Sequence, residues 1–230
     1  MAWLKAEYEF ASLFSYRIPD FSSQYALTSP LPGPSTIKLA LVATAIRSTG
    51  NIKLGERIFE KIRNVAIAIL PPKRIAISNV LIRRLKKKRG KVGLGFEETF
   101  GIRGYAHFSS SLKIYVNIKE EDKGEIKNIL SRIRQLGSYD SIVCCKGEPL
   151  EEAPLNCIRP IESLERVEKN ILLVPVKDIN SDPAIKFEDV NPYYINKKSR
   201  KTKEIFINKF YPLNIVKSEV GKNWIIYELE

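Results

Sequence analysis

The sequence predicts an α+β protein: a ferredoxin-like domain with a basic insertion, followed by a smaller C-terminal β-rich lobe. Three observations support this class. Residues 1–146 follow the order strand, helix, strand, strand, helix, strand, which is the split βαβ plan. A basic, glycine-rich segment at about 81–110 separates the two middle strands. Residues 147–230 carry looser strand patterns between polar stretches.

The first strand and the first helix are separated by a proline-rich loop. Residues 4–16 alternate apolar and polar side chains, which predicts a long strand with one buried face. Residues 17–34 are rich in Ser and Pro and predict a loop. The composition of residues 37–49 favours a buried helix, and Ser35 and Thr36 precede it as expected N-cap hydroxyls.

Gly50 is expected to end this helix, and a second amphipathic helix is predicted over 52–62. The next two segments, 65–70 and 74–80, predict short strands around a Pro-Pro pair. After the basic segment, the pattern predicts a strand, a helix and a buried strand, and then three strands of the C-terminal lobe. These are residues 112–118, 121–136 and 141–145, followed by 171–176, 204–208 and 223–228.

Composition bounds the class of protein. A chain of 230 residues suits one domain with an appended lobe, and 44% hydrophobic and 28% charged residues are ordinary for a globular protein. No run of 18 apolar residues occurs, and Glu7 and Glu9 interrupt the N-terminus, so we expect a cytoplasmic protein without a membrane span. The presence of only two glutamines favours a thermophilic source.

The positive charge is concentrated in one segment. The chain has 38 basic and 26 acidic residues, a net charge of +12, and residues 73–103 hold ten of the basic residues and two of the acidic ones. Such density favours a nucleic-acid partner because phosphates relieve its self-repulsion, although a solvated loop is the plain alternative. Near it, Arg103, Tyr105 and His107 combine a phosphate-binding cation with rings that can stack on unpaired bases.

The start of the first helix is a second candidate site. Its free amides and the hydroxyls of Ser35 and Thr36 favour an anion, although plain capping would produce the same sequence. Arg47 lies on the polar face of this helix. The candidate RNA-binding residues are Pro34, Ser35, Thr36, Arg47, Arg83, Arg84, Lys86, Lys87, Lys88, Arg89, Lys91, Arg103, Tyr105 and His107.

One histidine and three irregularly placed cysteines exclude the usual zinc sites and a disulfide framework, and no nucleotide-cofactor motif is present, so neither a metal nor a cofactor is expected. Metal-independent cleavage of RNA remains an alternative function. Its candidate residues are His107 as acid or base, with Tyr105 and Lys113. A basic protein associated with ribosomes or tRNA is a third possibility.

Three segments carry a resemblance to a known family: Phe14-Ser-Tyr-Arg17, the Pro-rich entry Ser29–Ile37 into the first helix, and the Leu136-Gly-Ser stretch through Val143. Residues 1–146 resemble the fifth CRISPR-associated protein family of the RAMP superfamily. The resemblance implies an RRM-like, ferredoxin-like domain with a β-hairpin thumb, which would fall at residues 81–110. It also implies a subunit that caps the 5′ handle of crRNA in a type I effector complex, Cascade.

The expected partners are therefore crRNA, the backbone and large subunits of that complex and, through guide pairing, target DNA. Residues Pro34, Ser35 and Thr36 would lie at the handle-binding end of the helix, and the thumb would supply the basic segment. One subtype of the family cuts precursor RNA with Tyr, Lys and His. This chain lacks an adjacent Lys-His pair, so the resemblance favours a non-catalytic RNA-binding subunit in antiviral defence.

Overall fold

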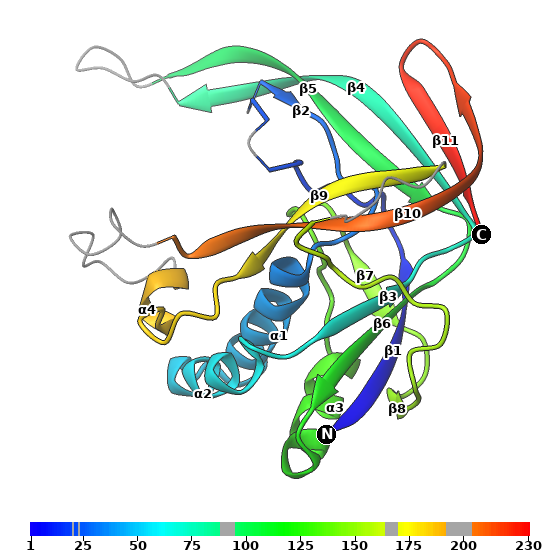
Figure 1. The fold of residues 1–230 in the computed structure, drawn as a ribbon. Helices are drawn as coiled ribbons and strands as arrows, with labels where there is room; N and C mark the ends of the chain where they lie inside the picture. Colours follow the sequence, from blue (N-terminus) through cyan, green and yellow to red (C-terminus); the bar gives the residue numbers. More distant parts are fainter. Residues whose placement is uncertain (20, 23, 88–94, 164–169, 192–203) are drawn as a thin grey trace.

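The computed structural model describes residues 1–19, 21–22, 24–87, 95–163, 170–191 and 204–230. The protein is α+β, with two mostly antiparallel sheets and few helices (Figure 1). In the described part of the chain, no helix is both long and apolar enough to cross a membrane.

The first sheet has the strand order β3-β6-β1-β7, and every neighbouring pair is antiparallel. A further short strand, β8, also pairs with β1. The strands are β1 (Ala2–Phe10), β3 (Ile67–Leu70), β6 (Leu112–Ile118), β7 (Val143–Cys145) and β8 (Leu150–Glu151). The helical elements are α1 (Pro34–Thr49), α2 (Ile52–Ile62), the 3-10 turn η1 (Glu120–Asp122), α3 (Lys123–Ser131) and α4 (Phe187–Val190).

The second sheet contains the predicted hairpin and the C-terminal strands together. Its order is β2-β5-β4-β11-β10-β9. The strands are β2 (Tyr25–Ala26), β4 (Arg74–Lys87), β5 (Phe96–Phe108), β9 (Ile171–Ile179), β10 (Phe206–Val220) and β11 (Trp224–Leu229). The C-terminal strands thus extend the sheet of the hairpin, because β11 pairs with β4 from Arg74 to Ser78.

Several predicted boundaries are corrected. The strand expected over 4–16 ends at Phe10, because the chain then leaves the first sheet and Phe14 pairs with Ala106 of β5. The alternation persists past Phe10 because Phe14 is buried in the same core. The helix expected over 121–136 ends at Ser131, although Ile133 and Leu136 remain buried. By contrast, the helix at 52–62 and the strand at 112–118 are confirmed.

The start of α1 also differs from expectation. Gly33 occupies the N-cap position and no side chain caps the helix, so the N-cap role expected of Ser35 and Thr36 is wrong. A Cβ atom at Gly33 would lie 3.2 Å from the carbonyl oxygen of Lys177, so glycine allows the helix to begin close against β9. The expected end is confirmed: Gly50 adopts a left-handed conformation, and its amide donates to the carbonyl of Ile46.

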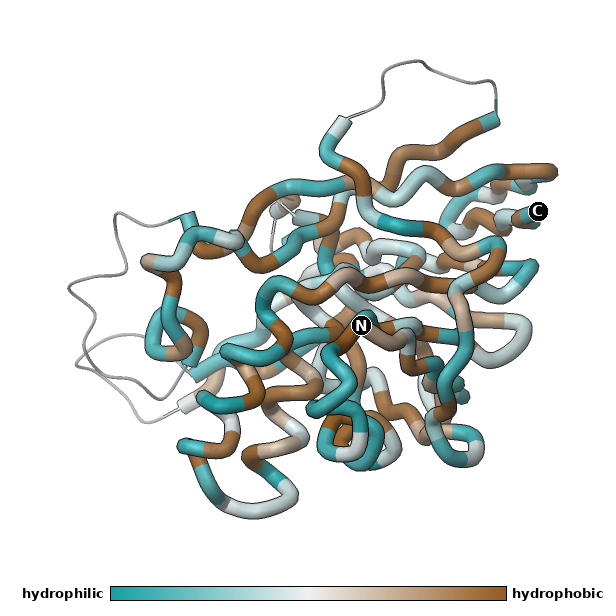
Figure 2. Tube along the Cα trace, turned by 60° about the horizontal axis from the view of Figure 1, so that its bottom comes forward, coloured by the Kyte–Doolittle hydropathy of each residue, from teal (hydrophilic) through white to brown (hydrophobic). Residues whose placement is uncertain are grey.

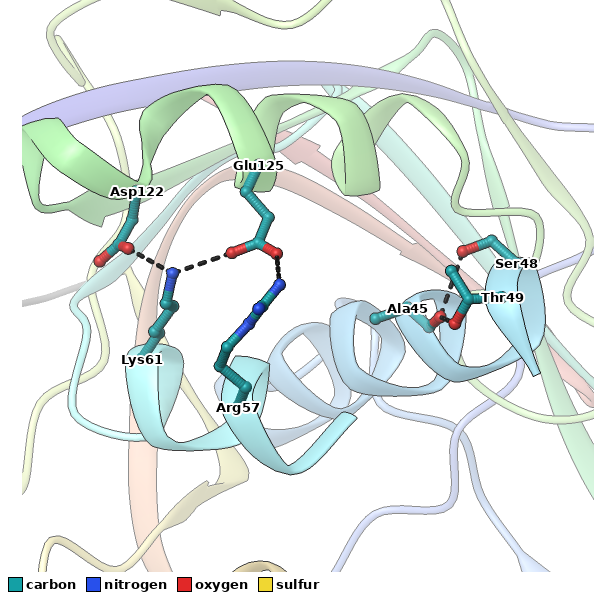
Figure 3. Close-up of polar contacts among 7 residues, drawn as sticks. All are labelled: Ala45, Ser48, Thr49, Arg57, Lys61, Asp122 and Glu125. Carbon is teal, nitrogen blue, oxygen red and sulfur yellow. Dashed lines mark hydrogen bonds and ion pairs between the residues drawn. The ribbon is translucent and has the colours of Figure 1, made fainter. Parts of the chain in front are cut away.

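A single core joins the two sheets and the helices. Its buried apolar side chains come from β1 and β6 of the first sheet, from α1, α2 and α3, and from β4, β5, β9 and β10 of the second. Figure 2 shows apolar stretches running through the interior and hydrophilic stretches at the outer loops. The helices α2 and α3 are also connected by ion pairs, in which Lys61 lies 2.6 Å from Asp122 and 2.8 Å from Glu125, while Arg57 contacts Glu125 (Figure 3).

Candidate nucleic-acid interface

The β4–β5 hairpin has two chemically different faces. Residues directly opposite each other in an antiparallel ladder point to the same side, and alternate residues point to opposite sides. The register pairs Ile82 with Gly101 and Arg84 with Thr99, so these side chains and Lys86 share one face with Arg103. We call this the cationic face.

The opposite side of the same hairpin is largely apolar. Four large side chains there, Leu81, Leu85, Phe96 and Phe100, are 68%, 67%, 67% and 60% exposed. The basic residues on this apolar face are Arg83 and Lys87, and Arg83 is paired with Glu98. The hairpin therefore divides the predicted basic cluster between its two faces. The remaining predicted residues of the tip, Lys88, Arg89 and Lys91, lie outside the described residues.

A first cavity of about 280 Å³, the hairpin cavity, lies along the cationic face. Its lining includes Gln24, Ile82, Arg84, Lys86, Thr99 and Arg103. Arg84 has one carboxylate nearby, since its Nη2 atom lies 3.9 Å from Asp140 Oδ2. In the described part of the chain, neither Lys86 nor Arg103 forms an ion pair. These cations are therefore available to an anionic ligand.

A second cavity of about 310 Å³, the junction cavity, lies at the root of the hairpin. It is lined by Ser15, Tyr16, Arg17, Ala26, Arg103, Gly137 and Ser138. Gly137 has a φ of +110°, and a Cβ atom there would lie 2.7 Å from the Phe14 ring. Any other residue would therefore push apart the two segments that form this wall.

A third cavity of about 260 Å³, the helix cavity, follows the exposed side of α1. Its lining includes Tyr16, Thr36, Thr44, Arg47, Gln135 and Gly137. Arg47 Nη1 donates a 3.0 Å hydrogen bond to Gln135 Oε1. The hydroxyl of Thr36 is buried and has no hydrogen-bond partner in the described part of the protein. A buried polar atom without a partner costs free energy, so a polar ligand group that reached this hydroxyl would relieve that cost.

The three cavities are neighbours that share lining residues, and we call them together the track. Arg103 lines both the hairpin cavity and the junction cavity, while Tyr16 and Gly137 line both the junction cavity and the helix cavity. Among the described lining residues none is acidic. Both glutamines of the chain, Gln24 and Gln135, line it. The basic residues of the track are Arg17, Arg47, Arg84, Lys86 and Arg103.

The structure brings only part of the predicted site together. Arg84, Lys86 and Arg103 meet in the hairpin cavity, and Thr36 and Arg47 meet in the helix cavity. Pro34, Ser35 and Thr36 are all buried, but only Thr36 lines one of the three cavities.

Tyr105 and His107 lie two residues apart on the same face of β5, and His107 lines another cavity, of about 260 Å³, beside Glu9 and Ser12. Lys113, their proposed catalytic companion, lies on β6 of the other sheet, where it pairs with Glu7 of β1.

Sequence reasoning from charge missed the wall of the junction cavity. Tyr16 and Arg17 belong to a polar loop entry, and Gly137 and Ser138 belong to a turn, so neither pair stands out by composition. Both pairs nevertheless fall within the segments that carry the family resemblance. That resemblance was the signal that could have found them.

Comparisons with known proteins bear on the chain as a whole and not on a particular site. No family model matches the sequence. A protein from Archaeoglobus fulgidus described as CRISPR-associated protein Cas5 is 44% identical, and the alignment covers 100% of both chains. A crystal structure of a CRISPR protein from the same organism is 14% identical with a TM-score of 0.46, over 100% of this chain and 92% of that one.

Proposed function

The chain belongs to the Cas5 family of CRISPR-associated proteins, and on this premise we propose that it is a non-catalytic RNA-binding subunit that caps the 5′ handle of crRNA. It acts within a type I effector complex, Cascade, that targets foreign DNA. The observation that carries the proposal is the track of three neighbouring cavities from the hairpin to α1, with five basic side chains and no described acidic lining residue.

The chemistry of the track suits a single strand of RNA. Lys86, Arg84 and Arg103 follow one another along the cationic face and bind successive phosphates. Tyr16 offers a ring for stacking, and the amide of Gln24 can recognise the edge of an unpaired base. The amide of Gln135 accepts from Arg47 and donates to the carbonyl of Ser138, so it positions Arg47 in the track. Thr36 and Arg47 close the far end of the track with a hydroxyl and a cation.

The apolar face of the hairpin accounts for the protein partners. Four exposed large side chains on one narrow strand pair are more than a solvated hairpin needs, and such patches favour protein contacts. We assign this face to a neighbouring subunit of the complex. Target DNA would be read by pairing with the guide, so this chain needs no base-specific contacts to it.

The first sheet supports a ferredoxin-like RAMP domain. In the order β3-β6-β1-β7, the first and third strands of the split βαβ plan lie at the centre, with the second and fourth beside them. The hairpin β4–β5 would then be the thumb of the family. It leaves the domain between β3 and β6, where the sequence predicts an insertion.

Removing the charges of the track tests RNA binding. The combined variant Arg17→Gln, Arg84→Gln, Lys86→Gln and Arg103→Gln should bind labelled repeat RNA more weakly in fluorescence anisotropy. The plot of log K against log salt should become less steep, by about 0.7 for each phosphate that the variant no longer neutralises. The matched control is Lys53→Gln on α2, an exposed lysine outside the three cavities. An unchanged affinity and slope in the combined variant would contradict the proposal.

Two further measurements separate the alternatives. Sequencing RNA that copurifies with the protein should recover a uniform 5′ handle, whereas mixed tRNA or ribosomal fragments would support a general basic protein instead. Incubation with repeat RNA in EDTA should leave that RNA intact. Cleavage that disappears in His107→Ala would establish the endoribonuclease and exclude a role limited to capping.

A further inference from the structure

The outer face of the second sheet carries an aromatic cluster that the track does not use. The register pairs Trp224 of β11 with Ser78 of β4, and Ser78 with Tyr105 of β5, so the three side chains form one row on the same face. The next row contains Ile226, Ala76 and His107. We call these six residues the platform.

The platform faces away from the core. The opposite side of the same strands carries Ile75, Ile77 and Phe108, which belong to the hydrophobic core. All six platform residues are at least partly exposed: Trp224 is 44% exposed, His107 is exposed, and the other four are half-buried. The platform therefore keeps part of its apolar and aromatic surface open to solvent.

The shape of the platform follows from residue size. The middle strand contributes only Ala76 and Ser78, while the larger side chains stand on the strands at either side. Adjacent strands are about 4.8 Å apart, so the backbones that carry Trp224 and Tyr105 are about 10 Å apart. The Trp224 ring packs directly against Gly221, where a Cβ atom would overlap the ring, and this contact holds the ring in place.

The charges around the platform favour a nucleic-acid strand that runs along β5. Four carboxylates stand on or beside this face. On the Trp224 side, Glu219 is paired with Lys217 at 2.7 Å and Glu228 with Arg74 at 3.8 Å. Glu9, beside His107, is paired with Lys146 at 3.1 Å, and Glu97 lies opposite Lys86 near the outer end of the hairpin. Arg103 follows Tyr105 on the same face, and it also lines the track. A strand leaving the track at Arg103 would meet the platform next.

We propose that the outer face of the second sheet, centred on Trp224 and Tyr105, is a second binding surface for single-stranded nucleic acid, on which unpaired bases stack. Arg103 holds the phosphate and the rings hold the bases, which is how sheet surfaces bind single strands in general. The inference goes beyond the proposed capping role and requires only that the chain bind an unpaired strand. RNA and DNA share this chemistry, and the experiment distinguishes them.

Tryptophan fluorescence gives a direct readout. The protein has two tryptophans, so the variant Trp3→Phe leaves Trp224 as the reporter. Titration with oligo(U) RNA and with oligo(dT) DNA of equal length should quench the reporter in a saturable way for one or both strands. A blunt RNA duplex, whose bases are already paired, should not quench it. If labelled RNA binds by anisotropy while the reporter is unchanged by either strand, the platform is excluded and the track is retained. If no RNA binds at all, both proposals fail.

Substitutions that preserve packing provide the second readout. Trp224→Leu and Tyr105→Leu keep apolar bulk but lose the aromatic face, and each should weaken binding about tenfold, or about 1.4 kcal/mol, which is within what one stacked base contributes. In both leucine variants the plot of log K against log salt should keep its slope, whereas in Arg103→Gln it should become less steep. Trp224→Phe should restore most of the affinity, and Tyr139→Leu, at an 89% exposed loop tyrosine, is the matched control. Leucine variants that retain full affinity for the single strand would overturn the proposal. So would leucine variants that lose the binding of a protein partner but keep that affinity.

Discussion

Lys38 shows how one residue connects distant parts of the chain. This lysine of α1 is 2% exposed, and its Nζ atom donates hydrogen bonds to Asp178 of β9 at 2.8 Å and to the carbonyl of Arg63 at 2.9 Å. Burial lowers the pKa of Lys38, and the nearby carboxylate of Asp178 counteracts that effect. The ion pair thus holds β9 against the helix whose outer side forms the helix cavity.

Replacing Asp178 should lower the free energy of unfolding more than replacing Lys38. Asp178→Leu leaves the ammonium of Lys38 buried without a counter-ion, and should destabilise the protein by about 3 kcal/mol or more. Lys38→Met should cost less, because Asp178 still accepts from the amide of Ile179 at 2.8 Å and lies 3.4 Å from Lys209. Urea denaturation of both variants and of the double variant measures the difference. Equal losses in the two single variants would show that the pair does not act in this way.

At the residue scale, the sequence could predict the chemistry of a site but not its accessibility. Arg84, Lys86 and Arg103 were predictable from charge density alone, and they line one cavity. Pro34 and Ser35 were predicted from the same reasoning that identified Thr36, yet only Thr36 reaches a cavity. The difference arises because β9, which is more than 130 residues away in the chain, lies against the start of the helix.

At the scale of elements, amphipathic patterns in the sequence predicted the bounds of those helices and strands whose ends are set by local packing. The helix at 52–62 and the strand at 112–118 each have one apolar face and clear ends, and both were predicted with the correct bounds. The strand expected over 74–80 continues to Lys87, because its outer half is stabilised by pairing with β5 rather than by burial. Its second neighbour, β11, comes from the other end of the chain, and no local pattern reveals that pairing.

The contact between α2 and α3 should depend on pH. Burial raises the pKa of Glu125, but hydrogen bonds from Lys61 and Arg57 lower it by more, so that its net pKa lies below 4.5. Hydrogen bonds from Lys61 to Asp122 and Glu125 raise the pKa of Lys61 above 10.5. A lowered carboxyl pKa stabilises the fold above the unfolded value and loses that effect in acid, while a raised lysine pKa loses its effect at alkaline pH.

The variant Glu125→Gln should therefore lower the free energy of unfolding by about 1 kcal/mol at neutral pH, a modest figure because the paired side chains are partly exposed. The difference from the unmodified protein should shrink as the pH falls below about 4.5. Thermal unfolding at several pH values measures it. Glu121→Gln is the control, since Glu121 lies 3.7 Å from Lys119 and contacts no other helix through an ion pair in the described residues. A loss that is constant with pH would contradict this account.

At the scale of the whole molecule, the two sheets share one core, although the sequence divides at about residue 146 into a regular and a looser part. Residues after 146 supply Val174, Val176, Tyr211 and Leu213 to the core, all nearly inaccessible to solvent. The hydroxyl of Tyr211 donates to the carbonyl of Pro32, at the entry to α1. The C-terminal part therefore supports the elements that form the helix cavity and the root of the hairpin.

A fragment of residues 1–146 should for this reason fail to fold cooperatively by itself. It would leave the backbone edge of β4 unpaired where β11 pairs with it. It would also leave Lys38 without Asp178, either buried or exposed by opening of the core. Calorimetry and the dispersion of amide resonances should show no cooperative transition and no native spectrum for the fragment. Adding a separately produced fragment of residues 147–230 should restore both signals, because the missing strands and the missing core then return together. A sharp unfolding transition in the isolated first fragment would instead show that its sheet and helices form a sufficient core, and that the C-terminal strands only extend it.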